Sequence, residues 1–189
     1  MTLTNAQPKC YPGLLSDSVE FFAVEGGLKF LSSGKVEAAC NMPYHVAKLA
    51  EDKIKSEKDT SAALKDWYPN SEFDQVLCFY KCRYGGLDFV ADIENNELQE
   101  GDYWDCPARK TCKYNGIICK PPTVNGIELT SFDVQLLKLL STSATNEKIA
   151  FDLQIPFGSL HKPKQALYEK FKVQTRQELT IKTRDLNII

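Results

Sequence analysis

The stretch that decides the fold of the C-terminal third is ELTSFDVQLLKLLSTSATNEKIAFDLQIPFGSLHKPKQALYEKFKVQTRQELTIKTRDL, residues Glu128–Leu186. Thr130 precedes its first apolar run and Asp133 follows three residues later, so this pair predicts the N-cap and the acidic partner at the start of a first helix. Apolar residues at helical spacing then predict the buried face of that helix: Val134, Leu136, Leu137, Leu139 and Leu140.

Three more helices are expected after this first one. Thr145 predicts the N-cap of a second helix over residues 146–153. A short turn then leads to a third helix over residues 157–171, and a fourth begins near Arg176. A helix, a tight turn and a second helix that carries basic residues form the helix-turn-helix arrangement of DNA-binding proteins.

These residues resemble the LuxR/FixJ-type C-terminal DNA-binding domain. The resemblance covers about sixty residues without a gap and implies an all-α four-helix fold. The shared pattern is ELT at 128–130, LLKLL at 136–140, TNEKIA at 145–150, L-x-I at Leu153 and Ile155, SLHK at 159–162, LYEKFKV at 167–173 and R-x-EL at 176–179.

The resemblance also implies a mode of DNA binding, because the third helix of this family enters the major groove. The residues that would face DNA from this helix are Ser159, His161, Lys162, Lys164 and Gln165. The start of the second helix would hold a phosphate through its side chains and its backbone N–H groups. The residues there are Thr145, Asn146 and Lys148.

Three residues depart from the family pattern. Phe132 replaces a usual basic residue, His161 replaces a usual lysine, and Pro163 stands where the family commonly has histidine. A proline inside a helix removes one hydrogen bond and costs about 3 kcal/mol. We therefore expect the third helix either to kink at Pro163 or to begin later than in the family.

Charge is unevenly distributed along the chain, whose formal net charge is −2. Residues 128–189 contain nine basic and seven acidic residues, a net of +2, so the upstream part carries −4. Residues 157–184 contain seven basic and two acidic residues, a net of +5. Because DNA affinity is largely electrostatic, this local excess favours a surface that faces phosphates.

Five of the seven cysteines are clustered in a way that suggests a metal site. Cys78 and Cys82 are one helical turn apart, whereas Cys106, Cys112 and Cys119 lie in a segment with few apolar residues. Four thiolates bound to a structural zinc would order this segment, which leaves one cysteine spare. An iron–sulfur cluster and cysteines without any ligand are the alternatives.

The upstream part predicts an α+β domain over residues 1–120, which would include the cysteine cluster and would bind a partner or form oligomers. A linker at 121–127 and the helix-turn-helix domain at 128–189 would follow. Short strands are expected at 19–24, 28–31, 36–39 and 87–93, and helices at 43–56, 60–67 with Asp59 as cap, and 71–81 with Ser71 as cap.

Several function classes are disfavoured by the sequence. It has no apolar run of membrane-spanning length and no secretion signal, so we expect a cytoplasmic protein that does not contact membranes. We expect no enzymatic activity, because the two histidines fall in different domains and no phosphate-binding glycine loop is present.

The preferred hypothesis is therefore a transcriptional regulator of bacterial or phage type that binds double-stranded DNA, with a homodimer as a possible form. One alternative is a protein-interaction module that keeps the fold but binds RNA polymerase or another protein. Another is a redox or metal sensor in which the cysteine cluster controls DNA binding.

Overall fold

A computed structural model describes residues 10–189, which divide into two compact units, residues 10–101 and residues 102–189. The chain mixes helices with small antiparallel sheets, as predicted from the sequence. Within residues 10–189, none of the helices combines the length and the apolar character needed to cross a membrane.

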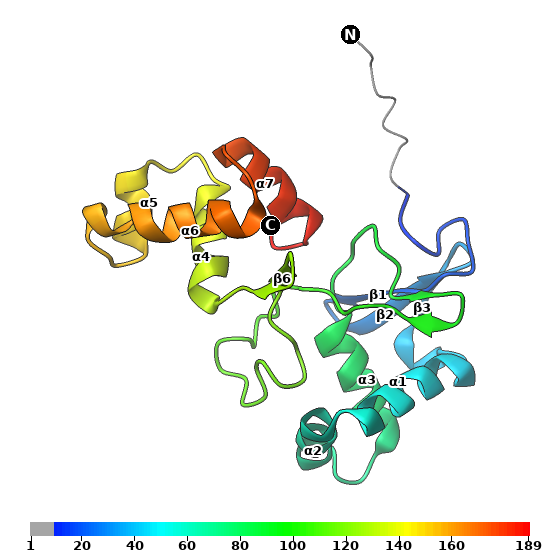
Figure 1. Cartoon of the computed structure of the whole chain (residues 1–189). Coiled ribbons are helices and arrows are strands. Elements are labelled where there is room, and N and C mark those ends of the chain that lie inside the picture. The colour runs from blue at the N-terminus through cyan, green and yellow to red at the C-terminus, as the bar shows by residue number, and fades with distance from the viewer. Residues whose placement is uncertain (1–9) are drawn as a thin grey trace. The chain divides into compact units, whose positions relative to one another are not determined.

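The first unit contains a three-stranded antiparallel sheet in the order β1-β2-β3 (Figure 1). These strands confirm the first three predicted ones and span Glu20–Val24, Gly27–Ser32 and Lys35–Ala38. Gly34 closes the tight turn between β2 and β3 with a φ of 74°, a conformation that glycine adopts without steric cost.

A short 3-10 helix, η1 (Ala39–Asn41), leads from the sheet to α1 (Tyr44–Ser56), α2 (Lys58–Trp67) and α3 (Glu72–Arg83). The Ser71 hydroxyl caps α3 as predicted, because it accepts the backbone N–H of Asp74 at 3.1 Å. The predicted cap Asp59 is wrong, since α2 begins at Lys58, two residues before the predicted start, and Asp59 lies in its first turn. Glu57 takes the capping position, where its carboxylate is held by Arg83 at 2.9 Å.

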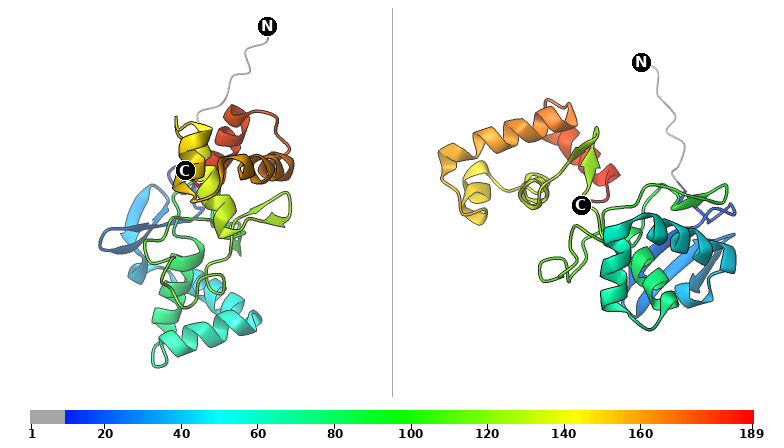
Figure 2. Two further views of the ribbon diagram at one scale, coloured as in Figure 1. Left: turned by 90° about the vertical axis from the view of Figure 1, so that its left-hand side faces the viewer. Right: turned by 60° about the horizontal axis from the view of Figure 1, so that its bottom comes forward.

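α3 packs against the sheet (Figure 2), and its aromatic rings form the core of this unit. Phe21 on β1 stacks on Tyr80 with ring centroids 4.0 Å apart, and both rings are fully buried. The Tyr80 hydroxyl donates to the carbonyl of Val46 on α1 at 2.6 Å, and burial raises the pKa of this phenol. This one side chain therefore links the sheet, α1 and α3.

The strand predicted over residues 87–93 is mostly absent. Only β4 (Ile93–Glu94) forms there, and it pairs with β5 (Glu97–Leu98). The Asp88 carboxylate accepts the backbone N–H of Val90 at 2.6 Å. Such local side-chain bonds compete with strand pairing, which explains the irregular path of these residues.

The second unit begins at Asp102, ahead of the predicted linker at 121–127. Tyr103 belongs to the core of the C-terminal helices, so the residues before the linker fold with this unit. The linker region itself contains a hairpin of β6 (Thr123–Val124) and β7 (Ile127–Glu128). Asn125 and Gly126 form its turn with positive φ angles, the usual chemistry of a two-residue hairpin loop.

Four α-helices and one 3-10 helix complete the second unit (Figure 1). They are α4 (Ser131–Leu140), α5 (Asn146–Asp152), the 3-10 helix η2 (Phe157–Ser159), α6 (His161–Phe171) and α7 (Arg176–Asp185). Their shared core contains every residue of the first helix that was predicted to be buried except Leu139, which is half-buried against it. The side chains that are least exposed in this core are Leu136, Leu137, Leu140, Ile149, Leu167, Phe171 and Leu179.

Candidate nucleic-acid interface

The start of α4 is fixed by the predicted capping box. The Thr130 hydroxyl accepts the backbone N–H of Asp133 at 3.1 Å, and Asp133 Oδ2 accepts the N–H of Thr130 at 2.9 Å. The same oxygen lies 2.7 Å from Nζ of Lys170 on α6. Burial acts to raise the pKa of the Asp133 carboxyl, but the bonds from Lys170 and Thr130 outweigh it and hold this pKa below its usual value.

The turn between α5 and α6 is set by backbone bonds at the end of α5. The N–H of Gln154 donates to the carbonyl of Phe151, and the N–H of Ile155 donates to the carbonyl of Ala150, both at 3.0 Å. Gln154 adopts a left-handed φ of 56°, which is common where a helix ends. The chain therefore reverses within a few residues and enters η2 directly.

Pro163 decides where the third helix starts. The single helix predicted over 157–171 is wrong, because residues 157–159 form the separate 3-10 helix η2 and α6 begins at His161. Pro163 is thus the third residue of α6, where a backbone N–H has no partner within the helix in any case. The helix begins later instead of kinking, and Ser159 lies before α6.

The predicted base-facing residues lie at and just before the first two turns of α6. Ser159, His161, Lys162 and Gln165 are exposed, and Lys164 is half-buried. Lys164 Nζ lies 5.7 Å from the centre of the Tyr168 ring on the same helix. The structure thus brings these residues to one end of α6 and leaves most of their polar groups accessible.

The predicted phosphate-binding residues Thr145, Asn146 and Lys148 are also exposed at the start of α5. The Thr145 hydroxyl caps this helix by accepting the N–H of Lys148 at 3.3 Å, and Lys148 Nζ pairs with Asp152 at 2.6 Å. Glu147 occupies the same helix end. Hydrogen bonds from its own N–H and from Thr145 lower the pKa of the Glu147 carboxyl. A phosphate at this position has to compete with that carboxylate.

Not all of the positive charge of residues 157–184 is available to a nucleic acid. Lys170 pairs with Asp133, and Lys182 donates to the carbonyl of Phe171 at 2.8 Å. The Arg176 guanidinium donates hydrogen bonds to backbone carbonyls. The remaining basic side chains are those of Lys162, Lys164, Lys172 and Arg184, and within residues 10–189 none of these four has an ion pair.

Arg176 has a structural role that the sequence did not reveal. Its guanidinium donates to the carbonyls of Leu140 at 2.5 Å, Ala144 at 3.0 Å and Thr142 at 2.6 Å. These carbonyls lie at the end of α4 and in the turn before α5, so α7 holds the turn that carries the α5 N-terminus. The only signal in the sequence is the R-x-EL motif, which does not say what the arginine binds.

The cysteines divide between the two units. Cys78 and Cys82 lie on α3 with their sulfur atoms 4.0 Å apart, as their spacing predicted. Cys106, Cys112 and Cys119 lie in turns of the second unit, where their three sulfur atoms do not gather within 4.8 Å of one another. None of the seven cysteines forms a disulfide. The zinc or iron–sulfur site over these cysteines stays a prediction.

No protein-family model, curated protein or solved structure matches this chain.

Proposed function

We propose that this protein is a DNA-binding transcriptional regulator of bacterial or phage type, in which α6 enters the major groove. The observation that carries the proposal is the row of exposed polar side chains at the end of η2 and the start of α6. Ser159, His161, Lys162 and Gln165 come directly after a tight turn from α5. Hydrogen-bonding side chains on an exposed helix end can reach base edges in the major groove.

Electrostatics supports the same function. Lys162, Lys164, Lys172 and Arg184 offer cations that the described part of the chain does not neutralise by ion pairs. Each phosphate that such a cation contacts adds about −0.9 to the slope of log affinity against log salt concentration. Up to four contacts predict a slope of about −3 to −4 for one domain.

The resemblance to the LuxR/FixJ type gives the proposal its expected geometry, with Thr145, Asn146 and Lys148 near the phosphate backbone. The later start of α6 changes that geometry, since Ser159 then approaches DNA from η2. A homodimer would place two α6 helices on two half-sites, about one helical turn of DNA apart.

The experiment that tests the function is fluorescence anisotropy of reduced protein against a labelled pool of duplex DNA fragments over a salt series. We expect sub-micromolar binding to a subset of fragments and a steep loss of affinity with salt. Binding no tighter than about 10⁻⁴ M at physiological salt contradicts the proposal, because that is the weak end of non-specific contact.

We also propose a structural zinc for the clustered cysteines. Four of Cys78, Cys82, Cys106, Cys112 and Cys119 would hold it as thiolates. Metal analysis of protein purified under reducing conditions is expected to find one zinc per chain and no visible absorption band. A brown protein would indicate an iron–sulfur cluster instead.

One observation favours a second candidate, a module that binds RNA polymerase or another protein. Phe151 on α5 and Phe157 in η2 are 76% and 57% exposed, although large apolar side chains are usually buried. A partner that covers these rings would bind with little dependence on salt. Loss of a partner from Phe151→Ala protein that still binds DNA would support this candidate.

A further inference from the structure

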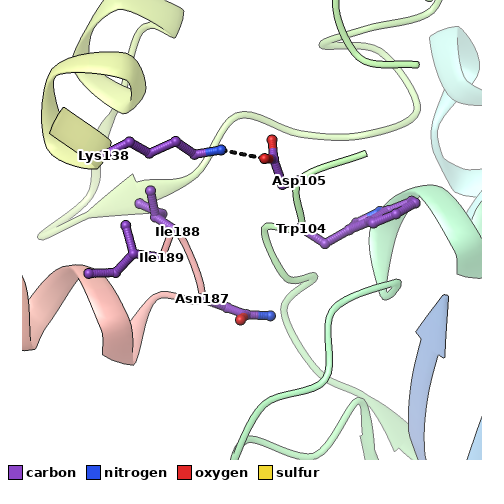
Figure 3. Close-up of a pocket in the computed structure, with 6 residues that line it drawn as sticks. All are labelled: Trp104, Asp105, Lys138, Asn187, Ile188 and Ile189. Carbon is purple, nitrogen blue, oxygen red and sulfur yellow. Dashed lines mark ion pairs between the residues drawn. The ribbon is translucent and has the colours of Figure 1, made fainter. Parts of the chain in front are cut away.

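The second unit contains a pocket of about 430 Å³ whose lining includes none of the residues assigned to DNA above. Its volume lies within the range of sites that bind small molecules. Figure 3 shows its lining residues, which come from the segment after Asp102, from α4 and from the chain after α7. They are Trp104, Asp105, Lys138, Asn187, Ile188 and Ile189.

One cation and one anion meet in this pocket. Lys138 Nζ lies 2.6 Å from Asp105 Oδ2, and the two side chains are 33% and 71% exposed. An ion pair that is this exposed contributes only about 0–1 kcal/mol, so its two members can exchange partners at low cost.

The other side chains of the lining are apolar or neutral. Ile188 is buried, and its backbone N–H donates to the carbonyl of Thr183 at 3.2 Å, which fixes the chain after α7. Ile189 remains 40% exposed and offers an apolar surface to a ligand. The side-chain amide of Asn187 adds a hydrogen-bond donor and acceptor.

We propose that this pocket binds a free amino acid with an apolar side chain. The carboxylate of such a ligand would pair with Lys138 and its ammonium with Asp105, while its side chain would cover Ile189. A ligand with both charges replaces the single Lys138–Asp105 ion pair by two ion pairs, one with each side chain. A ligand with a single charge can pair with only one of Lys138 and Asp105, so it gains one ion pair fewer than a ligand with both charges.

The test uses three probes of nearly equal size: L-leucine, 4-methylpentanoate, which lacks the ammonium group, and 3-methylbutylamine, which lacks the carboxylate. Trp67→Phe protein keeps Trp104 as its only tryptophan, so its fluorescence reports on the pocket. We expect saturable binding of L-leucine and binding up to about fivefold weaker for each singly charged probe.

Substitutions measure the contributions of the Lys138 and Asp105 charges to ligand binding one at a time. Lys138→Gln is expected to weaken the binding of L-leucine up to about fivefold and Asp105→Asn to weaken it similarly, whereas Asp105→Asn should not weaken the binding of 4-methylpentanoate. Lys120→Gln removes a cation of the same unit that does not line the pocket, and it should leave all three titrations unchanged. Thermal unfolding of each variant checks that the unit remains folded.

Two results would overturn the assignment. One is the absence of a saturable signal with L-leucine up to the order of 10 mM, which corresponds to negligible affinity. The other is equal affinity for all three probes, which would mean that the pocket binds by apolar contact alone. Neither readout depends on DNA, so the proposed function can fail while this inference stands, and the reverse also holds.

Discussion

Nζ of Lys170 lies 2.7 Å from Oδ2 of Asp133, so the last turns of α6 are tied to the capping box of α4. The carbonyl of Lys170 also accepts a hydrogen bond from the Asn125 amide at 2.7 Å. The helix proposed to read DNA is therefore held at its C-terminal end, while its N-terminal end remains accessible.

Asp133→Asn tests this anchor. We expect a loss of about 1–2 kcal/mol in the free energy of unfolding at pH 7, because the cap and the ion pair are both weakened. The folded-state pKa of Asp133 is lowered, so its stabilisation is present above the ordinary aspartate pKa and disappears as pH falls through the folded value. Urea unfolding from pH 7 to pH 3 should show the two proteins converging below about pH 4. A difference that persists unchanged at pH 3 would contradict this account.

Arg176→Lys tests the clamp between α7 and the α4–α5 turn. Lysine keeps the charge but cannot donate to three carbonyls in a fixed fork. The expected loss is about 2–3 kcal/mol in chemical unfolding, since bonds from a charged donor contribute about 1.5–3 kcal/mol each but are not additive. Lys172→Gln is the matched control, and it should change stability by less than about 0.5 kcal/mol.

Pro163→Ala distinguishes a proline in the first turn from one in a helix interior. In the first turn the missing N–H removes no helix bond, so alanine should change the free energy of unfolding by less than about 1 kcal/mol. An increase in stability near 3 kcal/mol would instead show that the proline interrupts a longer helix. Circular dichroism should report unchanged helix content.

Local sequence signals were sufficient to predict three of the helix starts. Thr130, Thr145 and Ser71 each predicted a helix start correctly, because an N-cap depends only on residues three positions away. The sequence left two starts open for α6, because Pro163 is compatible with either a kink or a late start. Asp59 failed as a cap because Glu57 is held by Arg83, a contact between residues 26 positions apart.

In the candidate interface, too, local features could be predicted from the sequence, whereas contacts between distant residues could not. The helix pattern predicts accessible polar residues at the start of α6, and His161, Lys162 and Gln165 are exposed there. The commitment of Lys170, Arg176 and Lys182 to the fold could not be predicted, because it depends on which carbonyls and carboxylates the folded chain brings near them. A count of charges along the sequence therefore overestimates the cations that can face DNA.

Glu147→Gln should strengthen DNA binding. Its carboxylate lies at the start of α5, where the proposal places a phosphate, and its lowered pKa means that it stays charged at neutral pH. Removal of this charge is expected to raise affinity several-fold at low salt and less at high salt, as screening predicts. Glu25→Gln, an exposed acidic residue of the first unit, should have little effect. Unchanged affinity for Glu147→Gln would mean that no phosphate lies near this helix end.

The most direct test of the DNA-binding proposal compares Lys162→Gln with Lys35→Gln, an exposed lysine on β3. Anisotropy titrations with one selected DNA fragment would be made over a salt series. The proposal predicts that Lys162→Gln lowers affinity and makes the salt slope shallower by about 1, whereas Lys35→Gln changes neither. Identical affinities and slopes for both variants and the original protein would contradict a role for α6 on DNA.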